Sequence, residues 1–334
     1  MTIYPDPIAP ERERSNEPLA DESGLMSSRR PGHDSRRTAQ FRDRTMAFAG
    51  ALFAAVIFGG NFVVGRHGVN AGLEPADIVA ARYAMAGAIF APMLLRHGIR
   101  ELGGVGWGRG AVLAALIGAP YAYCLMLGLQ MAPAVHGVVL HPGLTTVFGV
   151  LFSWISLGER LGRGAIVGIP TAFVGLILLA GKDFWNGGSL VWVGDLLFAV
   201  AAIWYGLFSV LMRRWQVPSA LSVEIICVLS AIMWLPAYAV FGRPQHLLDV
   251  PLKEVAYQAL YQGALANGLA VFLFAHAINT IGPSRTVIFA SLVPLFGTLL
   301  AVALLGEELT ALQGIGIAGV CVGLLMTIMT SHAT

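Results

Sequence analysis

The segment Leu144–Leu161 reads LTTVFGVLFSWISLGERL, and the segment Leu292–Leu309 reads LVPLFGTLLAVALLGEEL. The offset between the two copies is 148 residues, since Leu144 matches Leu292. Each copy is an apolar run of helix length, then Leu-Gly-Glu, then a second apolar run rich in glycine. A repeat with a fixed period reports the architecture of a chain. This one predicts two similar halves, an organisation that many membrane transporters share.

The composition places both halves in a lipid bilayer. Hydrophobic residues make up 56% of the 334 residues and charged residues only 12%, whereas a soluble domain carries about 25% charged residues. Residues 111–158, 255–284 and 310–334 contain no Asp, Glu, Lys or Arg. Since a transmembrane helix needs roughly 20 mostly apolar residues, the sequence predicts an all-α polytopic membrane protein. Charges and helix breakers divide it into ten spans, at residues 46–65, 77–95, 110–130, 134–157, 164–180, 190–211, 219–241, 255–277, 283–305 and 310–330.

The number of spans fixes the relation between the halves. Each half holds five spans, which is an odd number, so the second half enters the membrane upside down. The predicted fold class is therefore ten transmembrane helices arranged as two inverted five-helix repeats. With a cytoplasmic N-terminus, the inside loops hold eight arginines and the outside loops hold four basic residues. Because Lys and Arg favour cytoplasmic loops, both termini are expected in the cytoplasm, with the chain crossing a bacterial-type inner membrane.

The domain boundaries follow from these patterns. Residues 1–45 hold eight arginines and eight acidic residues without apolar periodicity, which predicts a disordered cytoplasmic tail. The first five-helix repeat is expected at 46–180 and the second at 190–330. A net charge of +2 favours no nucleic-acid partner. The three cysteines occur singly, so neither a disulfide nor a metal framework is expected.

A family resemblance rests on three stretches. They are FGGNFVVGRHGVNAGLEPADIVAARY at 58–83, LGERL at 157–161 and LGEEL at 305–309. In their order, spacing and duplication they resemble the EamA family of the drug/metabolite transporter superfamily, over about residues 46–330. The resemblance implies ten helices in two inverted repeats and the transport of small metabolites, often outward. One departure is visible: the family's proline is present at Pro294, but Thr146 stands at the matching place, and Pro142 one turn earlier could supply the break instead.

Two charged residues lie inside predicted spans. Arg82 follows Pro75 by seven residues, and Glu224 follows Pro218 by six, in corresponding spans of the two halves. A charge within a span is costly and usually faces a cavity or a partner, although snorkelling to the interface is an alternative. In a cavity, Arg82 could hold a substrate carboxylate. Glu224 could bind a substrate amine or exchange a proton.

Glu159 and Glu307 occupy the same position in the two copies, each after Leu-Gly at the end of a span. A carboxylate there can cap the N-terminus of the next helix, where the helix dipole favours negative charge. The alternative is a gate contact that breaks when the cavity opens to that side. Inversion of the repeats places Glu159 on the cytoplasmic side and Glu307 on the outer side.

Other candidates for a substrate site are polar groups at span depth. His141 precedes Pro142 and either makes an interhelical hydrogen bond or exchanges protons. His136 is five residues away, a spacing that does not favour a shared metal site. Amides can join helices, and aromatic rings can line a cavity for an amphipathic metabolite. These candidates are Asn61, Tyr121, Trp204, Tyr205, Gln262 and Asn267.

The sequence thus predicts a secondary transporter for a small organic metabolite, such as an amino acid or a derivative, working by alternating access and favouring export. No ATP-binding motif is present, so an ion gradient or the substrate's own gradient is expected to drive it, without a cofactor. Its expected partners are the substrate and the bilayer, and a homodimer is left open. An importer or an uncoupled facilitator is the alternative. A membrane enzyme is disfavoured because no clustered nucleophile, acid–base pair or metal motif is found.

Overall fold

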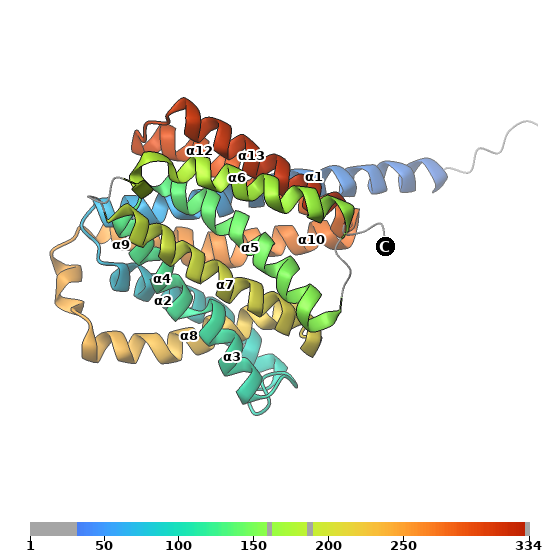
Figure 1. Ribbon diagram of the computed structural model, residues 1–334. Helices are drawn as coiled ribbons and strands as arrows, with labels where there is room; N and C mark the ends of the chain where they lie inside the picture. Colours follow the sequence, from blue (N-terminus) through green and yellow to red (C-terminus); the bar gives the residue numbers. More distant parts are fainter. Residues whose placement is uncertain (1–31, 159–161, 186–189, 331–334) are drawn as a thin grey trace, which may run out of the picture. The chain divides into compact units, whose positions relative to one another are not determined.

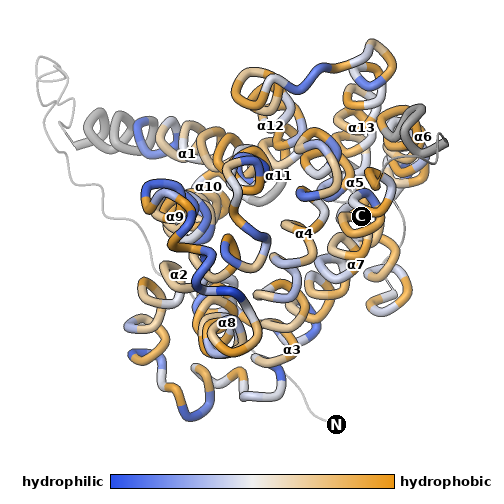
Figure 2. The backbone as a smooth tube through the Cα atoms, turned by 90° about the vertical axis from the view of Figure 1, so that its left-hand side faces the viewer, coloured by the Kyte–Doolittle hydropathy of each residue, from blue (hydrophilic) through white to orange (hydrophobic). Residues whose placement is uncertain are grey.

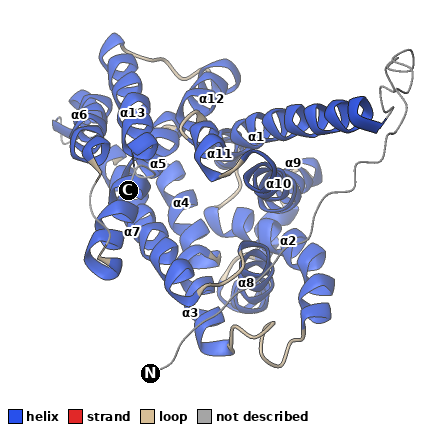
Figure 3. Cartoon of the chain, turned by 90° about the vertical axis from the view of Figure 1, so that its right-hand side faces the viewer, coloured by secondary structure: helices blue, strands red, loops and turns tan. Residues whose placement is uncertain are grey.

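The computed structural model describes residues 32–158, 162–185 and 190–330. All regular elements in these ranges are helical (Figure 3), and the helices are predominantly hydrophobic (Figure 2). Eight helical segments are long and apolar enough to cross a membrane, and two shorter apolar helices, Arg163–Leu179 and Ala311–Thr327, bring the number to ten. The predicted all-α membrane fold is confirmed.

The first half contains five spans, of which the third is divided. Its helices are α1 (Gly32–Asn70), α2 (Pro75–His97), α3 (Trp107–Ile117) with α4 (Ala119–Met131), α5 (Ala134–Leu157) and α6 (Arg163–Trp185). The division at Gly118 was not predicted. A Cβ at Gly118 would lie 2.2 Å from the Ser230 hydroxyl, which accepts a hydrogen bond from the Ala119 amide at 3.1 Å. The break thus admits a side chain from the other half to the start of α4.

The second half is less regular. It contains α7 (Val191–Trp215), α8 (Ser219–Phe241), the short 3₁₀ helix η1 (Pro244–Leu248), α9 (Leu252–Gln258) continuing as the π-helical η2 (Ala259–Ala270) and α10 (Val271–Ile281), α11 (Pro283–Ala290), α12 (Val293–Leu300) continuing as the π-helical η3 (Ala301–Leu305), and α13 (Ala311–Thr330). A turn at residues 291–292, just before Pro294, interrupts the ninth span. In the fourth span, by contrast, α5 continues through Pro142, whose carbonyl accepts a bond from the Thr146 hydroxyl at 3.1 Å.

Helix α1 begins earlier than the first predicted span. Residues 32–45, which the sequence assigned to the disordered tail, are helical. The stretch contains Arg, Gln and Ala, which are good helix formers, and it is continuous with an apolar span that propagates the helix. Residues 1–31 lie outside the described ranges.

Corresponding helices of the two halves pack against each other. Helix α2 packs along α8, and α6 packs along α13, as the neighbouring labels of α6 and α13 in Figure 1 show. Helix α5 packs against both α7 and α12. We call the end of the bundle where α1 ends and α5 begins the Asn70 face, and the end where α2 ends the His97 face.

The contact of α6 with α13 depends on glycines that face each other. A Cβ added to Gly316 would lie 2.6 Å from the Gly175 carbonyl oxygen, and one added to Gly323 would lie 2.6 Å from the Gly168 carbonyl oxygen. Small residues spaced in this way let two backbones approach closely in lipid. The glycine pairs therefore hold the fifth and tenth spans together, one from each half.

We expect Gly316→Leu to lower the free energy of unfolding by about 1–3 kcal/mol, because the new side chain forces α6 away. Gly314→Leu on the same helix is the matched control, since a Cβ there meets nothing within 4 Å. Thermal unfolding of both variants in detergent measures the difference. Equal stability of the two variants would contradict the glycine contact.

Candidate functional site

Arg82 of α2 points its guanidinium at two amides of η2. Its Nη2 donates to Asn267 Oδ1 at 2.8 Å, and its Nη1 lies 3.4 Å from Gln262 Oε1. The sequence predicted all three residues as site candidates, and the structure brings them together. Gln262 is fully buried and Arg82 is 9% exposed, so the guanidinium lies inside the bundle.

A third amide, Gln258, carries the contact on to α1. Gln262 Nε2 donates to Gln258 Oε1 at 2.6 Å, and Gln258 Nε2 donates to the Val64 carbonyl at 2.7 Å. We call Arg82, Gln258, Gln262 and Asn267 the Arg82 network. It links α1, α2 and the eighth span, and so fixes the position of the guanidinium.

Some hydrogen-bond donors of the Arg82 network have no acceptor among the described residues. A guanidinium offers five N–H donors, and Arg82 Nε is buried without a partner, as is Asn267 Nδ2. No carboxylate forms an ion pair with Arg82 among the described residues. Unpaired donors around a buried positive charge match an anion with several acceptor atoms, and a carboxylate is the common example.

Next to this network lies a cluster of aromatic side chains. The Tyr121 hydroxyl is 2.7 Å from His141 Nε2, and the rings of Phe62 and Tyr205 lie 5.8 and 6.0 Å from the His141 ring. Tyr121 and Tyr83 belong to one continuous core, and the Arg82 guanidinium lies 5.7 Å from the Tyr83 ring. Three predicted residues, Tyr121, His141 and Tyr205, therefore form an aromatic surface that carries tyrosine hydroxyls and a histidine ring as its polar groups.

The other predicted residues have separate positions. Trp204 packs against the same core, and Asn61 has a buried Oδ1 without a partner. Glu224 lies away from the Arg82 network, since its carboxylate meets His97 Nδ1 at 2.9 Å on the His97 face. At the opposite end of the same helix pair, Asp77 accepts from the Tyr238 hydroxyl and meets His246 Nδ1 at 3.1 Å.

Glu307 accepts hydrogen bonds from the first turn of α5. Its Oε1 receives the Ala134 amide at 2.6 Å and its Oε2 receives the Val135 amide at 3.0 Å. The sequence pointed to the next helix along the chain, whereas the capped helix belongs to the other half. Glu159 lies outside the described residues.

One more pair lies beside this cap. His136 Nδ1 is 2.8 Å from Asp195 Oδ1, which connects α5 to α7. Asp195 and Asp77 were not predicted as functional residues. Asp195 is a single carboxylate inside the apolar predicted span 190–211, and that signal could have identified it. Asp77 begins the predicted span 77–95 and takes part in a capping box in the first turn of α2, so its charge alone does not single it out.

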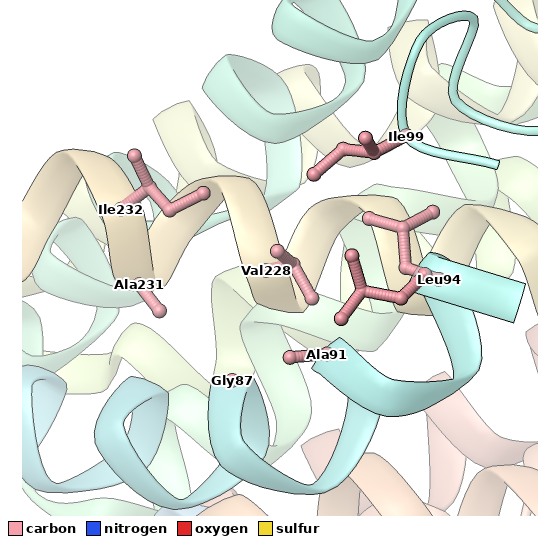
Figure 4. Close-up of a pocket in the computed structure, with 8 residues that line it drawn as sticks. Gly87, Ala91, Leu94, Ile99, Val228, Ala231 and Ile232 are labelled. Atoms are coloured by element: carbon pink, nitrogen blue, oxygen red, sulfur yellow. The ribbon is translucent and has the colours of Figure 1, made fainter.

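Two cavities lie outside the Arg82 network. One, of about 250 Å³, lies between α2 and α8 and is lined by apolar residues such as Gly87, Val228 and Ile232 (Figure 4). The other, of about 330 Å³, lies at the start of α5 and is lined by apolar residues together with polar ones such as His136 and Glu307. Arg82 lines neither cavity. No group of three or more His, Cys, Asp or Glu able to hold a metal ion occurs in the part of the chain that the structure describes.

Comparisons with known proteins agree with this fold. The model of the EamA-like transporter family matches residues 45–181 and 192–329. The uncharacterized transporter YetK of Bacillus subtilis is 25% identical over 63% of this chain and 64% of its own length. The uncharacterized transporter YyaM of the same organism is 22% identical over 81% of this chain and 90% of its own length. The uncharacterized protein PA1977 of Pseudomonas aeruginosa is 28% identical over 77% of this chain and 86% of its own length.

A solved protein, described only as "Crystal structure of protein", shares the fold. Its TM-score is 0.57 at 19% sequence identity, and the match covers 85% of this chain and 96% of that one. At this identity the likeness concerns the fold alone.

The cap on α5 gives a prediction for Glu307→Gln. The amide has one acceptor oxygen and turns an NH₂ group toward a backbone donor, so we expect a loss of about 1–3 kcal/mol in the free energy of unfolding. Glu308→Gln, at an exposed neighbour, should change it by less than about 0.5 kcal/mol. Thermal unfolding in detergent at neutral pH compares the two, and a matching loss in Glu308→Gln would argue against the cap.

Proposed function

Since the chain belongs to the EamA-like transporter family, we propose that it is a secondary transporter for a small organic metabolite that carries a carboxylate. Arg82 carries this proposal. Its guanidinium is buried in a membrane span, is held by two neutral amides and has no counter-ion among the described residues. An uncompensated charge at such a position is costly, and a substrate carboxylate would compensate it.

The surroundings of Arg82 narrow the substrate class. Tyr121, His141 and Tyr205 offer apolar surface with a few hydrogen-bonding tips. Sites of this kind suit an amphipathic molecule, with apolar contact for its body and a few polar groups to orient it. An amino acid or a derivative fits this description, and the relatives that are named as transporters support transport rather than catalysis.

The orientation follows from the basic residues in the loops, which favour a cytoplasmic N-terminus and C-terminus in the inner membrane. The Asn70 face is then the outer face. The two halves, residues 46–180 and 190–330, meet there through Glu307 with α5 and through His67 with Glu254 at 3.1 Å. In the proposed mechanism these contacts close the outer face.

Alternating access would open this face and close the other. Rocking of one half against the other must break the bonds from Ala134 and Val135 to Glu307, because they join the two halves at one face. In this mechanism the carboxylate binds at Arg82 from the cytoplasm, and export follows when Glu307 leaves α5. The gradient of the substrate or of an ion supplies the driving force.

A screen of carboxylate metabolites by thermal shift tests the site. Ligands that bind the folded protein raise its melting temperature. Arg82→Gln should weaken their binding by about tenfold to about a hundredfold, since removal of a charged hydrogen-bond donor costs about 1.5–3 kcal/mol.

The matched control for this screen is Arg109→Gln, which removes the same charge from a residue that lies 5.7 Å from the Trp215 ring. It should bind the same acids as the parent protein. Equal binding by the Arg82→Gln variant would remove the proposed site, and stabilisation by amines alone would change the substrate class.

Inversion of the repeats predicts the accessibility of two positions that lie 148 residues apart, Arg160 and Glu308. Arg160 lies outside the described residues. In a background without cysteine, Glu308→Cys should react with a membrane-impermeant maleimide in intact cells. Arg160→Cys should react only after permeabilisation. Reaction of both from the same side would rule out the proposed topology.

A further inference from the structure

A buried histidine–carboxylate pair at the Asn70 face has no part in substrate binding as proposed above. The His136 side chain of α5 is 1% exposed and the Asp195 side chain of α7 is 13% exposed. Their contact, of 2.8 Å, uses Nδ1 of the histidine. The other ring nitrogen, Nε2, is buried and has no hydrogen-bond partner. The pair therefore contains one unused proton-accepting atom.

The charge of the pair depends on that atom. An ionised carboxylate only accepts hydrogen bonds, so Asp195 keeps the hydrogen of a neutral His136 on Nδ1 and leaves a lone pair on Nε2. In this state the pair bears one net negative charge, and a buried charge without compensation is costly. A proton that bonds to Nε2 makes an imidazolium beside the carboxylate, so the pair becomes neutral and keeps its Nδ1–H···Oδ1 bond.

A cavity at the start of α5 lies beside the pair. It has a volume of about 330 Å³ and is lined by His136 with Glu307, Glu308, Thr310 and Gln313. Water bound to these polar groups would bring a proton to the edge of the buried ring.

The charged neighbours of His136 lie on several elements. Among the described residues they are Asp195 on α7, Glu307 and Glu308 after η3, and Arg66 on α1, whose guanidinium bonds the Leu129 and Gln130 carbonyls at the end of α4. Three of the four are carboxylates, so the pair lies among mostly negative charges.

We infer that the His136–Asp195 pair is the proton-binding site that couples transport to the proton gradient; this rests on the proposed transport function. The imidazolium places positive charge on the first turn of α5, next to the amides that hold Glu307. It strengthens the attraction of that carboxylate for α5 and keeps the Asn70 face closed. Loss of the proton weakens the contact and allows the face to open.

In this cycle each proton moves inward across the membrane while the exported substrate moves outward. A proton from the outer side bonds to Nε2 while the Asn70 face is open, and the face closes. When the His97 face opens, the space between the halves opens to the cytoplasm as far as α5, and the proton leaves Nε2 through the water that enters it. The acid then binds at Arg82, and the deprotonated pair permits the outer face to open again.

A reporter cysteine tests this coupling without a known substrate. Val135→Cys is placed in a background in which Cys124, Cys227 and Cys321 are replaced. The rate of labelling by an impermeant maleimide is measured from about pH 5.5 to about pH 8, the range in which histidine exchanges protons. Division by the rate for Lys253→Cys, an exposed position, removes the effect of thiol ionisation. The corrected rate should rise at least about fivefold toward alkaline pH.

His136→Gln and Asp195→Asn should both abolish this rise. His246→Gln is the matched control, because His246 also meets a buried carboxylate at the same face, and it should keep the rise. Gln313→Cys, which lines the same cavity, replaces Val135→Cys as the reporter if that variant does not fold. An unchanged rise in His136→Gln, or an equal loss in His246→Gln, overturns the assignment.

Flux of a carboxylate ligand into proteoliposomes, with and without a pH gradient, separates the two proposals. Flux that ignores the gradient, together with a pH response that survives His136→Gln, overturns the proton site and leaves transport intact. A pH response that disappears in His136→Gln, with no flux of any acid that binds, keeps the proton site and overturns the transport proposal.

Discussion

In the hydrocarbon of a bilayer a polar side chain has no water to bond, so it must find its partner within the protein. Arg82 shows how far this constraint reaches. Its Nη1 and Nη2 groups donate to the amides of Gln262 and Asn267 on η2, so α2 and the eighth span must meet at the depth of the guanidinium. Gln258 then ties the same span to α1 through the Val64 carbonyl. One charge thus determines how three spans from both halves are placed, while its remaining donors stay unpaired.

The same constraint acts at the ends of α2 and α8. Asp77, near the start of α2, meets His246 beyond the end of α8. Glu224, near the start of α8, meets His97 at the end of α2. Because the halves are inverted, one kind of contact appears at both faces of the bundle, with an apolar contact between them. This helix pair is joined at both faces at once, whereas Glu307 joins α5 at the Asn70 face alone. The α2–α8 pair can therefore serve as an axis of rotation, and the bonds between Glu307 and α5 can form and break.

Much of this architecture could be predicted from the sequence, because apolar length and a repeat of fixed offset are properties of the chain itself. The joining of Arg82 to Gln262 and Asn267 was not predictable, since it depends on how each helix is rotated about its axis. The pair of His136 with Asp195 was missed for the same reason: the residues lie on different helices, and no local spacing links them. For Glu307 the sequence left a helix cap and a gate contact open, and as a cap it pointed to the next helix along the chain, because sequence order does not say which helix begins nearest in space.

The packing also restricts how the halves can move. The glycines of α6 and α13 bring the backbones so close that the two helices cannot separate without losing most of their contact, and α2 with α8 is held at both faces. Both pairs join one half to the other, so they act as pivots rather than as gates.

The bending that alternating access requires must then come from irregular segments. The second half supplies them in the turn at residues 291–292 and in the π-helical stretches η2 and η3, and such stretches are frequent at functional sites. Because η3 leads directly to Glu307 and η2 carries Gln262, the segments that can bend also carry the gate contact and part of the Arg82 network. A shift in η3 therefore moves the gate contact, and a shift in η2 moves part of the Arg82 network.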